Sequence, residues 1–206
     1  MGKVLEMISR LVLVLALASA ALSGCGGKAA ALLAVPLQKA LGQSAPAPGA
    51  VASANGPVLV ASLPSQGRVL QLHILDRDGP VTTWATADGL QIMLRDGMLT
   101  QTRGLGMDMM SATVPSLAQI TSMKGHNRSH HYLEGSDEPF RRDYSCVVEA
   151  GATDKDLPNA RHLVETCTGP AGFITNHYWL QAGHLVKSKQ WVSQGVGFAI
   201  MATGQQ

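Results

Sequence analysis

Apolar and polar residues alternate with a period of two along much of the chain after Pro57. Leu70, Leu72 and Ile74 are separated by single polar residues, and residues 90–95 repeat this pattern. Successive side chains of a strand point to opposite faces, so this spacing predicts half-buried β-strands. Asp-Gly pairs follow at 78–79, 88–89 and 96–97. Asp-Gly favours the positive φ of a tight hairpin turn, so the sequence predicts a β-meander over residues 58–103.

The alternation stops over residues 107–130, where Leu117 and Ile120 have helical spacing behind Pro115. A short helix or an irregular crossover is expected there. Strand patterns then return in five segments, at 141–150, 161–169, 173–181, 184–192 and 196–200. The total is about nine or ten strands, and the predicted fold is all-β, with antiparallel sheets that form a sandwich or an open barrel-like domain.

The first 24 residues have the pattern of a bacterial signal peptide. Lys3 and Arg10 form a positive region before an apolar run at 11–21, which is shorter than a membrane-spanning helix needs, and the small residues of "LSG" precede Cys25. Leu-Ser-Gly-Cys resembles a lipobox, in which the Cys thiol receives a diacylglyceryl group and becomes the acylated N-terminus. Cys25 is therefore the expected lipid attachment site, with palmitate-like acyl chains as the membrane anchor.

Three segments follow from this interpretation. Residues 1–24 form the cleaved signal peptide, residues 25–57 carry the lipid, a short helix and an Ala/Pro-rich tether, and residues 58–206 form the β-domain. Gly26 follows the lipidated Cys where Asp would favour retention at the inner membrane. The expected location is therefore the outer membrane, with the domain facing the periplasm.

Cys146 and Cys167 remain once Cys25 carries lipid. An even pair in an oxidising compartment indicates a disulfide, although a free catalytic thiol is an alternative. Removal of the signal peptide lowers the formal net charge from +2 to +1, so the chain lacks the basic field of a nucleic-acid-binding protein. A cleaved chain of about 180 residues is sufficient for one domain with a core.

Two blocks of the sequence resemble the YjbF/GfcB family of lipoproteins from exopolysaccharide and group 4 capsule operons. The first block is "WATADGLQIMLRDGMLTQTRGLGMDMM" and the second is "YWLQAGHLVKSKQWVSQGVGFAIM". Matching positions are Trp84, Asp88, Gly89, Gly97, Thr102, Gly104 and Leu105, then Tyr178, Trp179, Ser188, Gln190 and Trp191. The resemblance implies an all-β periplasmic domain with a role in polysaccharide assembly or export, and it supplies no catalytic mechanism.

Side chains that could contact a glycan or a protein partner lie in or near these blocks. An aromatic ring stacks on the apolar face of a sugar, and a cation binds an acidic polymer. The candidates are Trp84, Arg103, Trp179, Lys187 and Trp191. Core packing is the competing interpretation for each Trp, and a solvent-facing strand position is the competing interpretation for each cation.

Motifs for catalysis are absent from the sequence. It has no nucleophile elbow, zinc-protease helix, Cys-x-x-Cys pair or phosphate loop, so no catalytic residue, metal or cofactor is expected. The cluster His126, His130 and His131 is more consistent with a solvated loop than with a metal site. The carboxylate pairs Asp137–Glu138 and Asp154–Asp156 lie among turn residues, which favours solvated charges over a glycosidase pair.

The leading hypothesis is a non-enzymatic, outer-membrane-anchored lipoprotein that assists exopolysaccharide or capsule assembly or export. Its partners would be the membrane, through the N-terminal lipid, and a polysaccharide or a polysaccharide-export protein. Two alternatives stay open: a carrier that holds a lipid or lipid-linked glycan in an apolar groove, and a polysaccharide-modifying hydrolase.

Overall fold

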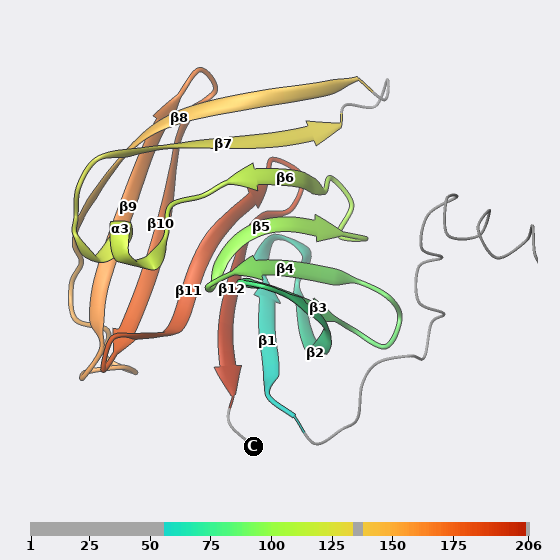
Figure 1. Cartoon of the computed structure of the whole chain (residues 1–206), viewed down its shortest axis with the longest axis horizontal. Helices are drawn as coiled ribbons and strands as arrows, with labels where there is room; N and C mark the ends of the chain where they lie inside the picture. Colours follow the sequence, from blue (N-terminus) through green and yellow to red (C-terminus); the bar gives the residue numbers. More distant parts are fainter. Residues whose placement is uncertain (1–55, 134–137, 205–206) are drawn as a thin grey trace, which may run out of the picture. The chain divides into compact units, whose positions relative to one another are not determined.

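The computed structural model describes residues 56–133 and 138–204. The signal peptide, Cys25, the helix expected over 28–43 and most of the tether lie outside these residues. The described residues form one antiparallel sheet of twelve strands, shown in Figure 1. The strands are β1 (Val58–Leu63), β2 (Arg68–Asp78), β3 (Val81–Ala85), β4 (Gln91–Arg95), β5 (Met98–Arg103), β6 (Met109–Thr113), β7 (His126–Leu133), β8 (Pro139–Ala150), β9 (Arg161–Gly169), β10 (Gly172–Gln181), β11 (His184–Ser193) and β12 (Gly197–Gly204).

The strand order is β5-β4-β3-β2-β1-β12-β11-β10-β9-β8-β7-β6. The first and last strands therefore pair in the middle of the sheet, and β5 and β6 form its two edges. The sheet curls until these edges lie side by side, as Figure 1 shows. The result is a nearly closed, barrel-like sheet, which agrees with the predicted all-β class and its barrel-like alternative.

Side chains join the two edges. The Thr102 hydroxyl donates to Asp108 Oδ1 at 2.8 Å, and the Met109 N–H donates to the Thr102 hydroxyl at 3.0 Å. Asp108 also accepts from the backbone N–H groups of Gly104 and Leu105. Exposed edge strands invite pairing with other chains, so this compact β5–β6 connection protects both edges.

The predicted β-meander is confirmed, because β1 to β5 are successive neighbours in the sheet. The Asp96-Gly97 turn has φ values of 49° and 84°, as a two-residue hairpin with two positive φ angles requires. The predicted strand total was too low. Residues 107–130 do contain a short helix, α3 (Leu117–Thr121), but they also contain β6 and the start of β7.

Side chains fill the interior of the curled sheet. The largest cluster joins β1, β2, β4, β5 and β12, and it includes fully buried Leu59, Leu72 and Ile92. A second cluster around Met98, Ile120 and Leu163 fills the interior next to α3. Within residues 56–133 and 138–204, no helix has the length and apolar character needed to cross a membrane.

Gln190 crosses the interior from β11 to the β4–β5 hairpin. Its Oε1 accepts from the Leu99 N–H at 2.9 Å, and its Nε2 donates to the Gly97 carbonyl at 2.7 Å. The side chain is fully buried. These bonds satisfy backbone groups inside the sheet and hold two opposite walls at a fixed separation.

A disulfide joins β8 to β9, as the sequence predicted. Cys146 and Cys167 are directly paired across the two strands, and both are buried. Tyr144 and Ile174 pack around the bond in a third cluster.

Removing this bond should lower the free energy of unfolding by about 3 kcal/mol, because the disulfide closes a loop between residues 21 positions apart. The variant is Cys146→Ala/Cys167→Ala, measured by urea denaturation. The neighbouring cross-strand pair Ser145 and Thr168 supplies the control, since both are exposed and their replacement by Ala should change stability by less than about 0.5 kcal/mol. Equal stability losses in the two double variants would contradict a stabilising role for the disulfide.

Candidate functional site

Strand β7 places polar side chains inside the curled sheet. Arg128, His130 and Tyr132 follow one another at a spacing of two and are all buried, and half-buried His126 precedes them on the same face. These positions pair with Cys146, Tyr144, Arg142 and Phe140 on β8. The two strands therefore line one wall of the interior with ionisable and aromatic groups.

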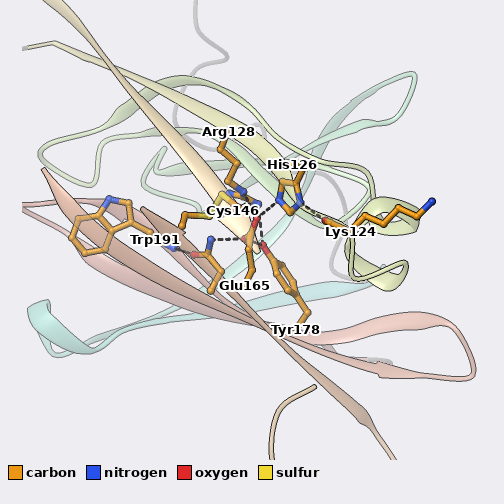
Figure 2. The surroundings of a disulfide bond; sticks show 9 residues. Lys124, His126, Arg128, Cys146, Glu165, Tyr178 and Trp191 are labelled. Carbon is orange, nitrogen blue, oxygen red and sulfur yellow. Dashed lines mark hydrogen bonds and ion pairs between the residues drawn. A yellow bond between two sulfur atoms is a disulfide. The ribbon is translucent and has the colours of Figure 1, made fainter. Parts of the chain in front are cut away.

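Glu165 of β9 lies at the centre of this wall, fully buried. Its Oε1 accepts from His126 Nε2 at 2.6 Å and from Arg128 Nε at 2.8 Å. Its Oε2 accepts from Asn176 Nδ2 at 2.7 Å and from the Tyr178 hydroxyl at 2.8 Å. Figure 2 shows these groups converging on the carboxylate beside the disulfide. We call these five residues the Glu165 network.

The Glu165 carboxyl group is ionised despite its burial. Desolvation raises its pKa, but the charge of Arg128 and the hydrogen bonds from His126, Asn176 and Tyr178 outweigh that effect and lower the pKa to about 2. The hydrogen bond to Glu165 raises the pKa of His126. The network thus satisfies one buried anion with one permanent cation, one titratable cation and two neutral donors.

The network is poorly suited to a metal ion. Ligand atoms of His126, Cys146 and Glu165 lie within 4.8 Å of one another. The Cys146 sulfur is committed to the disulfide, however, and the Arg128 guanidinium occupies the same carboxylate oxygen as His126. A divalent cation would need a thiolate and would be repelled by Arg128.

His130 is buried next to the network and is neutral. Burial, followed by the positive charge of Arg128, lowers its pKa to about 3. The Tyr132 hydroxyl donates to the Val192 carbonyl at 2.8 Å, so His130 Nδ1, 3.2 Å away, must donate to that hydroxyl. Its Nε2 is then an acceptor with no partner among the described residues. All three histidines lie on strand β7 and His130 is fully buried, so the expectation that they lie in a solvated loop was wrong.

A cavity of about 200 Å³ adjoins this wall, near the ends of β7 and β9 and the beginnings of β8 and β10. We call it the end cavity. Aromatic side chains dominate its lining, together with one guanidinium and one amide. Its lining residues are Met107, Tyr132, Phe140, Arg142, Tyr144, Ala171, Gly172, Phe173, Ile174, Trp191 and Gln194.

Arg142 is the cation of the end cavity. Its guanidinium carbon lies 5.1 Å from the centre of the Phe140 ring, a distance typical of a cation–π contact. No described carboxylate lies within ion-pair distance of Arg142, whereas Asp143 binds neighbouring Arg141 at 2.7 Å. The cavity therefore offers a positive charge beside aromatic surfaces.

The five contact residues predicted from the sequence do not form one site in the structure. Trp84 is 6% exposed and packs in the largest core cluster, and Arg103 is exposed at the end of β5. Trp191 lines the end cavity. Trp179 and Lys187 meet elsewhere, with the Lys187 ammonium 4.6 Å from the centre of the Trp179 ring.

The Trp179 ring is covered on its own surface of the sheet. His162 stacks on it with a centroid distance of 4.6 Å, and Asp154 of the β8–β9 loop binds Lys187 at 3.2 Å. Trp179 is only 8% exposed, so these neighbours leave it little area for a ligand. Of the carboxylate pairs considered in the sequence, Asp154 is engaged by Lys187, Asp156 and Glu138 are exposed, and Asp137 lies outside the described residues.

Most residues of the end cavity were not predicted from the sequence. Its aromatic and cationic wall comes from Phe140, Arg142 and Tyr144 in "PFRRDYSC". Their spacing of two predicts a shared face, and the same alternation continues to Cys146. This alternation was the signal from which the cavity wall could have been predicted. The Met cluster is mixed, because Met109 is fully buried whereas Met107 is exposed and lines the cavity.

These features define a class of protein: a curled, disulfide-bonded antiparallel sheet with an ionised network inside it and an aromatic cavity near several strand ends. The family model described as "Group 4 capsule polysaccharide lipoprotein gfcB, YjbF" matches residues 37–203. The match covers most of the chain, so the chain belongs to this family and is a capsule-associated lipoprotein of the cell envelope. The resemblance noted in the sequence is confirmed.

A solved structure has a similar fold. The chain is similar to the hypothetical lipoprotein YmcC from Escherichia coli K12, with a TM-score of 0.62 and 15% sequence identity over 73% of this chain and 84% of YmcC. At that identity the likeness concerns the fold. No curated protein matches the sequence.

Replacing Glu165 by Gln should lower the free energy of unfolding by about 3–5 kcal/mol, because the change leaves buried Arg128 without a counter-charge at nearly constant volume. Urea denaturation at pH 7 measures the loss. Asp143→Asn is the control, since it breaks an exposed ion pair with Arg141 and should cost about 1 kcal/mol or less. A Glu165→Gln variant as stable as Asp143→Asn would contradict the ionised network.

Lowering the pH from 6.5 to 4.5 should destabilise the domain through His130. The unfolded residue binds a proton near pH 6.5, whereas the folded residue resists protonation down to about pH 3, so stability falls by about 1.4 kcal/mol per pH unit in this window. Glu165, with a folded pKa of about 2, loses its contribution only below pH 4.5. The raised pKa of His126 affects the pH dependence of stability only above pH 6.5, outside this window.

Urea denaturation at several pH values in that window, for the parent and His130→Asn, measures this effect. Asn keeps a donor for the Tyr132 hydroxyl but does not titrate. The free energy of unfolding of the variant should therefore fall less steeply with pH, by about 1.4 kcal/mol per pH unit. The pKa of His177 is also lowered, by burial and by His162, and it leaves a residual slope in both proteins. Identical slopes would show that His130 does not resist protonation.

Proposed function

We propose that this chain is an outer-membrane-anchored, periplasm-facing lipoprotein that assists capsule or exopolysaccharide assembly or export without catalysing a reaction. The observation that carries this proposal is the family match over residues 37–203, which includes all of the described sheet except Gly204. The Leu-Ser-Gly-Cys sequence before it supplies the expected lipid attachment at Cys25. Gly26 at the next position supports export to the outer membrane.

The ionisable groups support a binding role rather than hydrolysis. A glycosidase needs a carboxyl group held protonated near neutral pH to act as the acid. The buried carboxylate, Glu165, has a pKa of about 2 and four hydrogen-bond donors, so it cannot serve as that acid. Hydrogen bonds from the Asp156 N–H and from Lys187 lower the pKa of Asp154.

The packed interior argues against the carrier alternative. An acyl chain needs a long apolar groove, whereas the described interior is filled by side chains such as Leu59, Leu72, Ile92 and Leu163. The end cavity, at about 200 Å³, is small for a lipid tail, and Arg142, Gln194 and two tyrosines contribute to its lining.

Deletion and complementation test the proposed function. Surface and periplasmic polysaccharide would be quantified in a deletion strain that carries the wild-type gene, the Cys25→Ser variant or no gene. We expect loss of surface polymer in the deletion, rescue by the wild type and no rescue by Cys25→Ser, because a chain without its acyl anchor leaves the membrane. Unchanged surface polymer in all three strains would contradict the proposal.

A further inference from the structure

We propose that the end cavity binds one carboxylate-bearing sugar unit of an acidic polysaccharide. This inference rests on the proposed function, since it names the ligand class and the site through which the protein would contact the polymer. It follows from three properties of the cavity: its size, its aromatic lining and its single cationic side chain.

The volume of the end cavity fits a single sugar ring. A cavity of about 150 Å³ inside a protein accommodates one benzene molecule. The end cavity, at about 200 Å³, therefore has space for one six-membered ring with polar substituents, whereas a folded peptide element or a lipid chain would need more. The cavity is also open to solvent, as a site for one unit of a longer polymer must be.

The lining offers flat apolar surfaces of the kind that pack against sugar C–H groups. Trp191, Phe140, Tyr132 and Tyr144 all contribute to it. Phe173, from the start of β10, also lines the cavity and is 76% exposed. A large aromatic side chain this exposed next to a cavity is typical of a contact surface rather than of a core.

Arg142 selects the acidic class of sugar. Its guanidinium presents several N–H donors in a plane, which matches the two oxygens of a carboxylate. The contact with Phe140 limits the freedom of the Arg142 side chain before a ligand arrives. No described acidic residue neutralises Arg142, so a bound carboxylate would supply the counter-charge.

The Glu165 network holds the cavity wall in place. The backbone N–H of Trp191 donates to Asn176 Oδ1 at 2.8 Å, and the Asn176 side-chain amide in turn donates to Glu165. On another side of the cavity, the Tyr132 hydroxyl is fixed by Val192 and His130. The backbone of Trp191 and the hydroxyl of Tyr132 are thus held by buried groups, and such preorganisation of the lining lowers the entropic cost of binding.

The test measures binding of small sugars to the purified full-length lipoprotein in detergent micelles at constant ionic strength. The probes are the methyl glycosides of glucuronic and galacturonic acid and, for comparison, those of glucose and galactose. Tryptophan fluorescence reports binding, and Trp191→Phe assigns the signal to the end cavity. We expect saturable binding of at least one acidic glycoside and binding about 10-fold weaker, or more, for its neutral counterpart, because a charge-assisted contact contributes about 1.5–3 kcal/mol.

Two arginines on the same strand provide the matched pair of variants. Arg142→Gln should weaken binding of the acidic glycoside about 10-fold or more and change that of the neutral glycoside less than about twofold. Arg141→Gln should leave both unchanged, because Arg141 is exposed and bound to Asp143 and does not line the cavity. Trp191→Leu should weaken binding of every glycoside by removing the stacking surface.

Three results would overturn the inference: no saturable binding of any acidic glycoside, equal affinity for acidic and neutral glycosides, or equal effects of Arg142→Gln and Arg141→Gln. The proposed function can survive each of these, because the deletion strain tests it separately. Loss of surface polymer on deletion, combined with full rescue by Arg142→Gln, would leave the export role intact and remove the cavity from it.

Discussion

The structure depends on keeping one carboxylate ionised inside a curled β-sheet. Glu165 has no contact with solvent, and an isolated charge in that position would cost more than a small domain can tolerate. Four donors from β7 and β10 surround it, so the strands on both sides of the disulfide must keep their register. Well-packed apolar groups often stabilise a protein as much as a buried ionic network does, so we attribute to this network the specific strand arrangement that it imposes.

Hydrogen bonds connect the Glu165 network and its neighbour His130 to residues that line the end cavity. Asn176 joins Glu165 to the backbone of Trp191, and buried His130 orients the Tyr132 hydroxyl. The disulfide adds a covalent link between β8 and β9 directly beside these groups. The polar part of the interior thus lies next to the surface where we expect a ligand, whereas β1, β2 and β4 contribute mainly apolar side chains to the largest core cluster.

The sequence predicted what apolar alternation can reveal. The meander from β1 to β5, the later strands and the Cys146–Cys167 bond were expected, because enough of their inward positions are apolar or Cys to keep the alternation visible, even though Glu165, Asn176 and Gln190 also point inward. Strand β7 was missed because its inward positions are His126, Arg128 and His130, which remove the apolar signal that marks a strand. Burial of these groups requires a carboxylate 37 residues further along the chain from Arg128, and no local pattern encodes that contact. Family membership was predictable from motif residues, yet some of them, such as Gln190 and Thr102, bind neighbouring backbone and side-chain groups that stabilise the fold.

The ionisation of Glu165 is the central claim, and a direct titration tests it. The protein would be labelled with ¹³C at the glutamate side-chain carboxyl groups, and the Glu165 resonance, assigned by its loss in Glu165→Gln, would be followed from pH 7 downward. The account predicts that this resonance stays at its ionised position through pH 4.5 and that the carboxylate protonates only near pH 2 or on unfolding. A midpoint at or above 4.5 would contradict it, because Glu165 would then be a protonated acid and Arg128 would lie buried without a counter-charge.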